Sequence, residues 1–192
     1  MSQAAERSPS QLRVPPHSLE AEESLLGAML LSEQAISAVA SVVTAEDFYR
    51  PAHRHIFDAI QALYGAGQAV DPVTVADELA QAGVLDAVGG PATLVSLQAR
   101  TPAITNALHY ARIVEEKALL RRLISTASEV AELGYSPLDD IEKTIDTAES
   151  MMFSVAQRRT NDTMAELNRK VSADGMDPRA VAEEFLTDQG LL

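Results

Sequence analysis

The chain has 192 residues, of which 46% are hydrophobic, so it has enough apolar material to build a folded core. It has no cysteine, which excludes a disulfide framework and thiolate metal ligands. Its formal net charge is −13, and the segment 18–107 holds three Arg or Lys against eleven Asp or Glu, a balance that would repel nucleic-acid phosphate. With neither a secretory signal nor a long apolar run in the sequence, we expect a cytoplasmic protein.

Helical patterns follow one another along the first half of the chain. Residues 1–17 are expected to be a flexible lead-in. Ser18 is a typical N-cap, and it precedes an acidic first turn and apolar residues at helical spacing. A second helix is expected over 33–43, and Pro51 suits the first turn of a third that runs to about Tyr64.

The same pattern continues up to residue 105. Asp71 and Pro72 lead into a helix that is expected from about Thr74 to Gly83, and "GGPATLVSLQA" predicts another short helix. No segment of useful length alternates with a period of two, so no strand is expected. The sequence predicts an all-α fold whose helical head covers 18–105.

The second half predicts a long antiparallel helical hairpin over 106–156. No Gly or Pro occurs from 106 to 133, which predicts a helix about 40 Å long at ~1.5 Å per residue. Gly134 and Pro137 break it, and a second long helix follows with apolar residues at heptad spacing. That seam comprises Leu138, Ile141, Ile145, Ala148, Met152 and Val155.

The hairpin has more apolar surface than it can cover by itself. Its first helix carries two apolar strips, one near Ile113, Leu120, Ile124 and Ala127 and the other near Leu119, Leu123 and Val130. Because one strip can pack on the return helix while the other stays open, we expect self-association. The predicted oligomer interface consists of Leu119, Leu123, Ile141, Ile145, Ala148 and Met152.

Two histidines in "DFYRPAHRHIFDAI" raise the question of a metal or acid–base site. His53 and His55 are two residues apart, which places them about 200° apart around a helix, so they cannot share a metal from one helix. We expect His53 to be hydrogen-bonded at the edge of the core. Phe48 and Tyr49 are expected to pack into the core, with Asp47 near a helix start; a ligand pocket floored by these aromatic residues is the alternative.

No other pattern indicates catalysis within this chain. The acids at 71, 77, 78 and 86 lack a paired-carboxylate arrangement, and "GAGQ" and "VGGP" lack the strand and the Lys-Ser/Thr of a phosphate-binding loop. We find no nucleophile elbow or metal-ligand constellation, so no cofactor or metal is expected in this fragment.

The densest basic group lies on the first long helix, at Arg112, Lys117, Arg121 and Arg122. These side chains could be solvated, or could pair with Glu115, Glu116 or the acids of the return helix, or could form a contact patch for a partner protein. A helical module that binds single-stranded DNA is the alternative function, and this basic group is its only support.

Several motifs together resemble one family. "PHSLEAEESLLGAMLL", "DFYRPAHRHIFDAIQAL", "DPVTVADEL", "GVLDAVGGPATLVSL" and "ALHYARIVEEKALLRRLI" occur in the order found in the N-terminal domain of the bacterial replicative DNA helicases, the DnaB family. The resemblance covers about 14–153, and it implies a six-helix globular head joined to a hairpin. It also implies that hairpins pair between subunits, that the domains assemble as a trimer of dimers, and that this collar docks primase during DNA replication, with a helicase loader as a further partner of the ring.

The resemblance also indicates where the hairpin would meet primase and what this chain lacks. The primase contact is expected near Arg121, Arg122 and Ile124. In the family, ATP binding with Mg²⁺, hydrolysis and most DNA binding belong to a motor domain with a GxxxxGK[ST] motif, which this sequence does not contain. Residues 157–192 are expected to be a polar linker and an appended helical tail. The end of that tail resembles the end of the solute-binding component of osmoprotectant importers.

Overall fold

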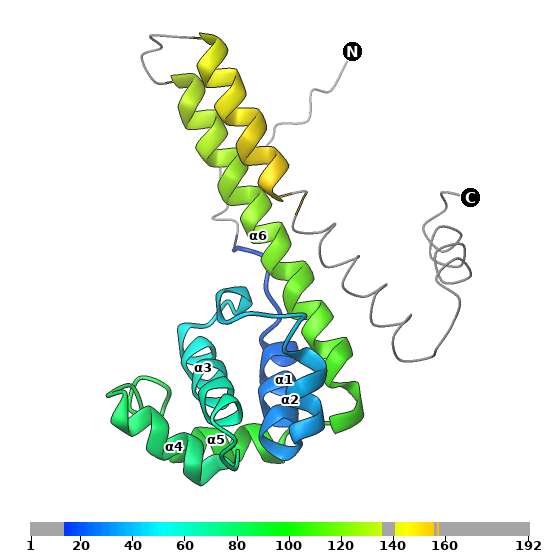
Figure 1. Cartoon of the computed structure of the whole chain (residues 1–192), viewed down its shortest axis with the longest axis vertical. Coiled ribbons are helices and arrows are strands. Elements are labelled where there is room, and N and C mark those ends of the chain that lie inside the picture. Colours follow the sequence, from blue (N-terminus) through cyan, green and yellow to red (C-terminus); the bar gives the residue numbers. More distant parts are fainter. Residues whose placement is uncertain (1–13, 136–140, 156, 158–192) are drawn as a thin grey trace, which may run out of the picture.

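The computed structural model describes residues 14–135, 141–155 and 157, and within them it contains helices and no strand, which confirms the all-α prediction (Figure 1). The α-helices are α1 (Leu19–Leu31), α2 (Glu33–Val39), α3 (Pro51–Gly65), α4 (Pro72–Gln81), α5 (Pro91–Ala99) and α6 (Ala107–Tyr135). Two 3-10 turns, η1 (Ala45–Asp47) and η2 (Ile104–Asn106), lie between them, and a further helix covers 141–155.

The helix starts follow the predicted capping chemistry. The Ser18 hydroxyl accepts a hydrogen bond from the Ala21 amide, and Oδ1 of Asp71 accepts hydrogen bonds from the amides of Val73 and Thr74 at 2.7 and 3.0 Å. These contacts satisfy amides that have no partner within their helices. Because Asp71 is the cap, α4 begins at Pro72, two residues before the predicted start.

The second helix is shorter than predicted. α2 ends at Val39 rather than at 43, and the chain turns so that Val43 becomes buried in the core. Thr44 then begins η1, where its amide donates a 2.8 Å hydrogen bond to Oδ2 of Asp47. Burial of Val43 and this local cap favour the turn over a longer helix.

The core of the head is built around α1, which is buried on nearly all sides from Ala21 to Leu30. Every other α-helix of the head contributes apolar side chains to the same cluster, and so does Phe48, which follows η1; the largest from the helices include Ile36, Ile56, Ile60, Leu79 and Leu94. Gly27 marks the closest approach of α1 and α5, because a Cβ atom there would lie 2.3 Å from the carbonyl oxygen of Leu97.

The long helix α6 belongs to both the head and the hairpin. Its buried residues, Ala107, Ala111, Val114 and Ala118, lie at spacings of four, three and four, so one narrow face of its first half packs on the head. Its second half extends away from the head, and the helix at 141–155 lies beside it (Figure 1). The predicted architecture of a six-helix head with a hairpin is thus present, with the first half of α6 as the sixth helix of the head.

In the part of the chain that the structure describes, no helix is long and apolar enough to span a bilayer. The predicted tail at 157–192 lies outside the described residues apart from residue 157, as do Pro137 and Leu138 of the predicted turn and seam.

Candidate protein-interaction surface

Large apolar side chains are exposed on both helices of the hairpin. On α6 these are Leu120, Leu123 and Ile124, and on the return helix they are Ile141, Ile145, Met152 and Phe153, with exposed fractions between 40% and 65%. Side chains of this kind gathered on two adjacent helices are typical of a surface that is covered by a partner.

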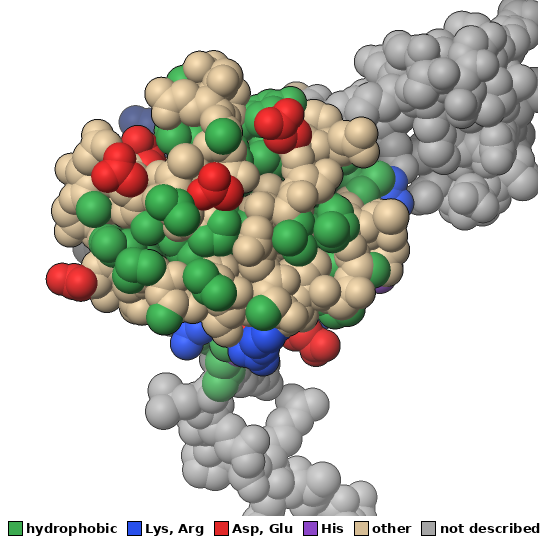
Figure 2. All heavy atoms as spheres, turned by 90° about the horizontal axis from the view of Figure 1, so that it is seen from below, with side chains coloured by type: hydrophobic (Ala, Val, Ile, Leu, Met, Phe, Trp, Pro, Cys, Tyr) green, Lys and Arg blue, Asp and Glu red, His purple; other side chains and the backbone are tan. Residues whose placement is uncertain are grey.

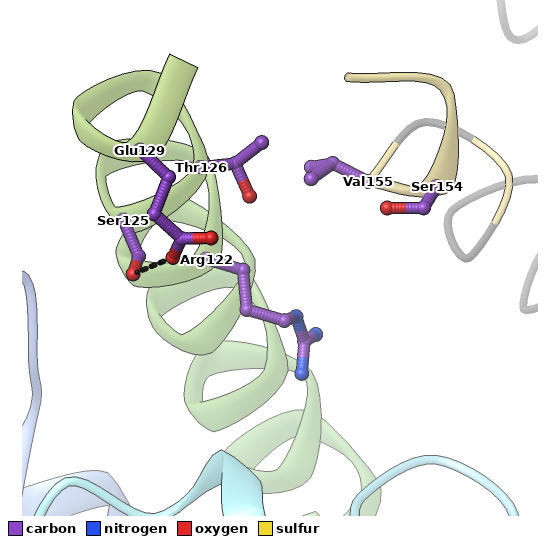
Figure 3. A pocket seen from close by; sticks show the side chains of 6 residues that line it. All are labelled: Arg122, Ser125, Thr126, Glu129, Ser154 and Val155. Carbon is purple, nitrogen blue, oxygen red and sulfur yellow. Dashed lines mark hydrogen bonds between the residues drawn. The ribbon is translucent and has the colours of Figure 1, made fainter. Parts of the chain in front are cut away.

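A different face of the return helix is turned toward α6. Its half-buried residues are Thr144, Ala148, Met151 and Val155, at spacings of four, three and four. Val155 and Thr126 face each other across a cleft of about 360 Å³ between the two helices (Figure 3). Ile141, Ile145 and Met152 therefore lie on the neighbouring stripe, which faces outward.

This arrangement places the six predicted interface residues in two groups. Leu123, Ile141, Ile145 and Met152 are exposed, whereas Leu119 and Ala148 are half-buried at the edge of the hairpin's own seam. One chain thus leaves most of the predicted interface uncovered, and the pairing itself stays a prediction.

At the base of the hairpin, two arginines of α6 turn toward the head. Nη1 of Arg122 lies 2.6 Å from Oδ1 of Asp47, and Arg121 donates to the backbone oxygens of Pro16, at 2.8 Å, and Asp47. The acid that pairs with Arg122 is therefore Asp47 of the head, which was not among the alternatives considered from the sequence. These contacts fix the direction in which α6 leaves the head.

Tyr49 completes this junction. The aromatic prediction was right for Phe48, which is fully buried, but wrong for Tyr49, which is half-buried and stacks on His17 with ring centroids 4.3 Å apart. The guanidinium of Arg121 lies 5.7 Å from the centroid of the Tyr49 ring, within range of a cation–π contact. Burial lowers the pKa of Arg121, and the charge of Glu22 opposes this shift.

Behind the junction, the core holds a buried acid and a buried histidine. Glu22 is 1% exposed and His53 is 2% exposed, and Oε2 of Glu22 lies 2.7 Å from Nδ1 of His53. Oε1 of Glu22 also accepts a 2.7 Å hydrogen bond from the Tyr49 amide. The structural role predicted for His53 is confirmed, although the residue lies deeper than the edge of the core.

Sequence reasoning missed Glu22 as a buried group. It was interpreted as one of the acids that favour a helix start, whereas the chain folds its carboxylate onto the backbone at Tyr49 and Arg50. The available signal was its position, since Glu22 lies three and four residues before the buried Leu25 and Leu26, on the apolar side of α1.

The other predicted histidine has a separate environment. His55 is half-buried and lies at a groove between α3 and α4, away from the Glu22–His53 pair. Among the described residues, no group of three or more His, Asp or Glu is arranged to hold a metal ion.

Comparison with known proteins identifies the family. Residues 14–116, more than half of the chain, match the model of the DnaB-like helicase N-terminal domain. The chain belongs to this family. The match includes the α1 segment with Glu22 and the segment with Asp47 and His53, so the buried Glu22–His53 pair lies within the matched region, whereas Arg121 and Arg122 follow it in the chain.

Solved structures of DnaB proteins share this fold. The N-terminal domain of DnaB helicase from Mycobacterium tuberculosis is 44% identical with a TM-score of 0.70, and the match covers 73% of this chain and 99% of that one. A DnaB-like replicative helicase, from a structure that also describes its interactions with primase, is 26% identical with a TM-score of 0.58, covering 72% of this chain and 31% of that one.

Curated relatives of the DnaB family are much longer than this chain. The replicative DNA helicase DnaB of Mycobacterium leprae is 41% identical over 172 residues, which is 88% of this chain and 28% of the relative. The replicative DNA helicase DnaC of Bacillus subtilis is 42% identical over 147 residues, or 77% of this chain and 32% of the relative. The chain thus spans about a third or less of these relatives.

Proposed function

We propose that this chain is the non-catalytic collar domain of a replicative DNA helicase, and that it assembles through its hairpin as a dimer or a trimer of dimers. The outward apolar stripe with Ile141, Ile145 and Met152 carries this proposal, because a single chain leaves it in water. The direction of α6, held by the contacts of Arg121 and Arg122 with the head, would present that stripe in one orientation to the next subunit.

The assembly can be tested by light scattering after size-exclusion chromatography at tens of micromolar. The full chain should elute as an oligomer, and the double variant Ile145→Asp with Met152→Asp should elute as a monomer. Val73→Asp is the matched control, because Val73 is 78% exposed on the head and its replacement should leave the mass unchanged. A strictly monomeric full chain, or an unchanged mass for the double variant, would contradict the proposal.

We further propose that the base of the hairpin docks primase, which the solved relative described with primase supports. Ile124 is 53% exposed, so its substitution should test this surface with little effect on the fold. Substitutions of Arg121 and Arg122 are harder to interpret, because these side chains also form contacts with the head that orient α6. A contact through Ile124 would lie beside the junction that orients the hairpin.

Calorimetric titration with primase's C-terminal helical domain tests this docking. Ile124→Asp should weaken binding at least about tenfold, which corresponds to about 1.4 kcal/mol. Val95→Asp, at an exposed position of α5 on the head, should leave binding unchanged. Equal affinities for the three proteins would remove Ile124 from the docking site. Arg121→Glu and Arg122→Glu are informative only when thermal unfolding shows that the head is intact.

The parent protein, in this proposal, is a cytoplasmic helicase that unwinds duplex DNA with ATP and Mg²⁺ in a separate motor domain, and a loader is a further candidate partner. The chain itself should show no ATPase activity. Direct binding of single-stranded DNA was the alternative function, and its support was the four basic residues of α6. Two of these, Arg121 and Arg122, contact the head, which weakens that support. Salt-dependent binding of single-stranded DNA by the full chain would revive that alternative.

A further inference from the structure

A groove lies between α3 and α4, at the end of the head away from the hairpin (Figure 1). Its volume is about 210 Å³. The residues that line it are His55, Asp58, Ala59 and Ala62 of α3 and Glu78, Leu79, Ala82 and Val84 of α4 and the turn after it. No residue of the hairpin, and neither member of the Glu22–His53 pair, contributes to this lining.

The groove exists because small side chains face each other along its length. The four lining residues of α3 lie at spacings of three, one and three, which is a single face of a helix. Ala59, Ala62 and Ala82 are too short to fill the space between the helices, and the buried Leu79 contributes to an apolar floor. A side chain from another molecule could therefore reach this floor.

The rim of the groove is acidic and lacks a counter-charge. Among the described residues, neither Asp58 nor Glu78 forms an ion pair, because the basic side chains of the head are engaged elsewhere. Arg50 and Arg100 pair with Glu23, and Arg54 pairs with Glu46. The end of the head away from the hairpin shows apolar and acidic side chains side by side, with Lys and Arg at its margin (Figure 2).

We propose that this groove binds a cationic amphipathic segment of a partner protein, which inserts an apolar side chain against Leu79 and places Lys or Arg beside Asp58 and Glu78. Nucleic acid has the wrong charge for this rim. A second copy of the head also has the wrong charge, since the segment 18–107 has eleven acidic and three basic residues. The site is separate from the proposed hairpin interface and goes beyond the proposed function.

The test uses a fluorescently labelled helical peptide of leucine and lysine, titrated with the full chain and followed by anisotropy. Asp58→Asn combined with Glu78→Gln should weaken binding about fivefold or more. This is the size of effect expected when two partly exposed ion pairs with the peptide are lost. Glu33→Gln combined with Asp86→Asn changes the net charge equally outside the groove and should have little effect. Ala62→Phe, at an exposed position, fills the groove and should abolish binding without disturbing the fold.

Three results would overturn the proposal. Equal weakening by the two charge-neutralising pairs would show that the peptide responds to net charge alone. Unchanged binding by Ala62→Phe would show that the peptide lies elsewhere. Cross-linking of the Ala62→Cys variant to a second copy of this chain would show that the groove is an interface between copies. Ile145→Asp with Met152→Asp should leave peptide binding intact, so failure of hairpin assembly is distinguishable from failure here.

Discussion

Arg122 on the hairpin helix and Asp47 in the head, 75 residues apart in sequence, form a 2.6 Å ion pair. Asp47 is 3% exposed, and its second carboxylate oxygen accepts hydrogen bonds from the amide and the hydroxyl of Thr44. One carboxylate therefore caps the turn η1 and holds α6, so the local structure of the head and the direction of the hairpin depend on the same group.

Replacing Asp47 should destabilise the protein clearly. Asp47→Ala leaves the Arg122 guanidinium and the Thr44 amide without this partner, and we expect the free energy of unfolding in urea to fall by about 2–3 kcal/mol. Asp77→Ala is the control, because Asp77 is exposed and its replacement should cost about 0.5 kcal/mol or less. Similar losses for the two variants would show that the Asp47 contacts contribute little.

Removing the Glu22 carboxylate should be more costly still. Glu22→Ala leaves the amide of Tyr49 and the ring of His53 without their buried acceptor, and we expect a loss of about 3–5 kcal/mol in unfolding free energy. Glu20→Ala removes an exposed acid from the same first turn of α1 and should cost about 0.5 kcal/mol. A Glu22→Ala protein as stable as the Glu20→Ala protein would contradict this account.

A methyl group at Gly27 should disrupt the contact between α1 and α5. The new Cβ would lie 2.0 Å from Oγ1 of Thr101 and 2.3 Å from the carbonyl oxygen of Leu97, so the helices must separate, at about 1–3 kcal/mol. Gly65→Ala is the opposite case: that Cβ meets no atom within 4 Å in α3, and we expect a gain of up to about 1 kcal/mol. Thermal unfolding of the two variants measures both effects, and shifts of the same sign would be evidence against the close packing at Gly27.

The cap at Asp71 should make stability depend on pH. Hydrogen bonds from the amides of Thr74 and Val73 lower the pKa of Asp71 below its ordinary value of 3.8. Its contribution is therefore fully present above that value and is lost as pH falls through the lower, folded-state pKa. Asp71→Ala should cost about 1 kcal/mol at neutral pH. In urea unfolding at a series of pH values, this difference should shrink only in the acid range; a pH-independent difference would exclude the effect.

The sequence predicted the local features of this fold well, because they depend on neighbouring residues. Ser18 was identified as a cap, Pro51 as part of the first turn of α3, and Asp71 with Pro72 as the approach to α4, from side-chain chemistry that acts within one turn of a helix. Gly134 was likewise expected to end the long helix, which in the structure runs to Tyr135.

The polar contacts between distant segments of the chain could not be predicted in the same way. Glu22 and His53 are 31 residues apart, and nothing in the spacing of either residue indicates the other. The same holds for Arg122, for which the sequence offered solvation, pairing with nearer acids of the hairpin or a partner contact, and not the distant Asp47. Tertiary packing decided both pairings, since a buried carboxylate requires donors and the fold supplies them from distant segments.

The small buried side chains of α6 have a mechanical consequence. Ala107, Ala111 and Ala118 let the first half of this helix lie close against the head, and no Gly or Pro interrupts the helix before Gly134. The backbone hydrogen bonds therefore form one continuous, stiff helix from the core to Tyr135. A force applied near Tyr135 would act as a torque on the packed core, and the contacts of Arg121 and Arg122 would resist rotation of α6 where it leaves the head.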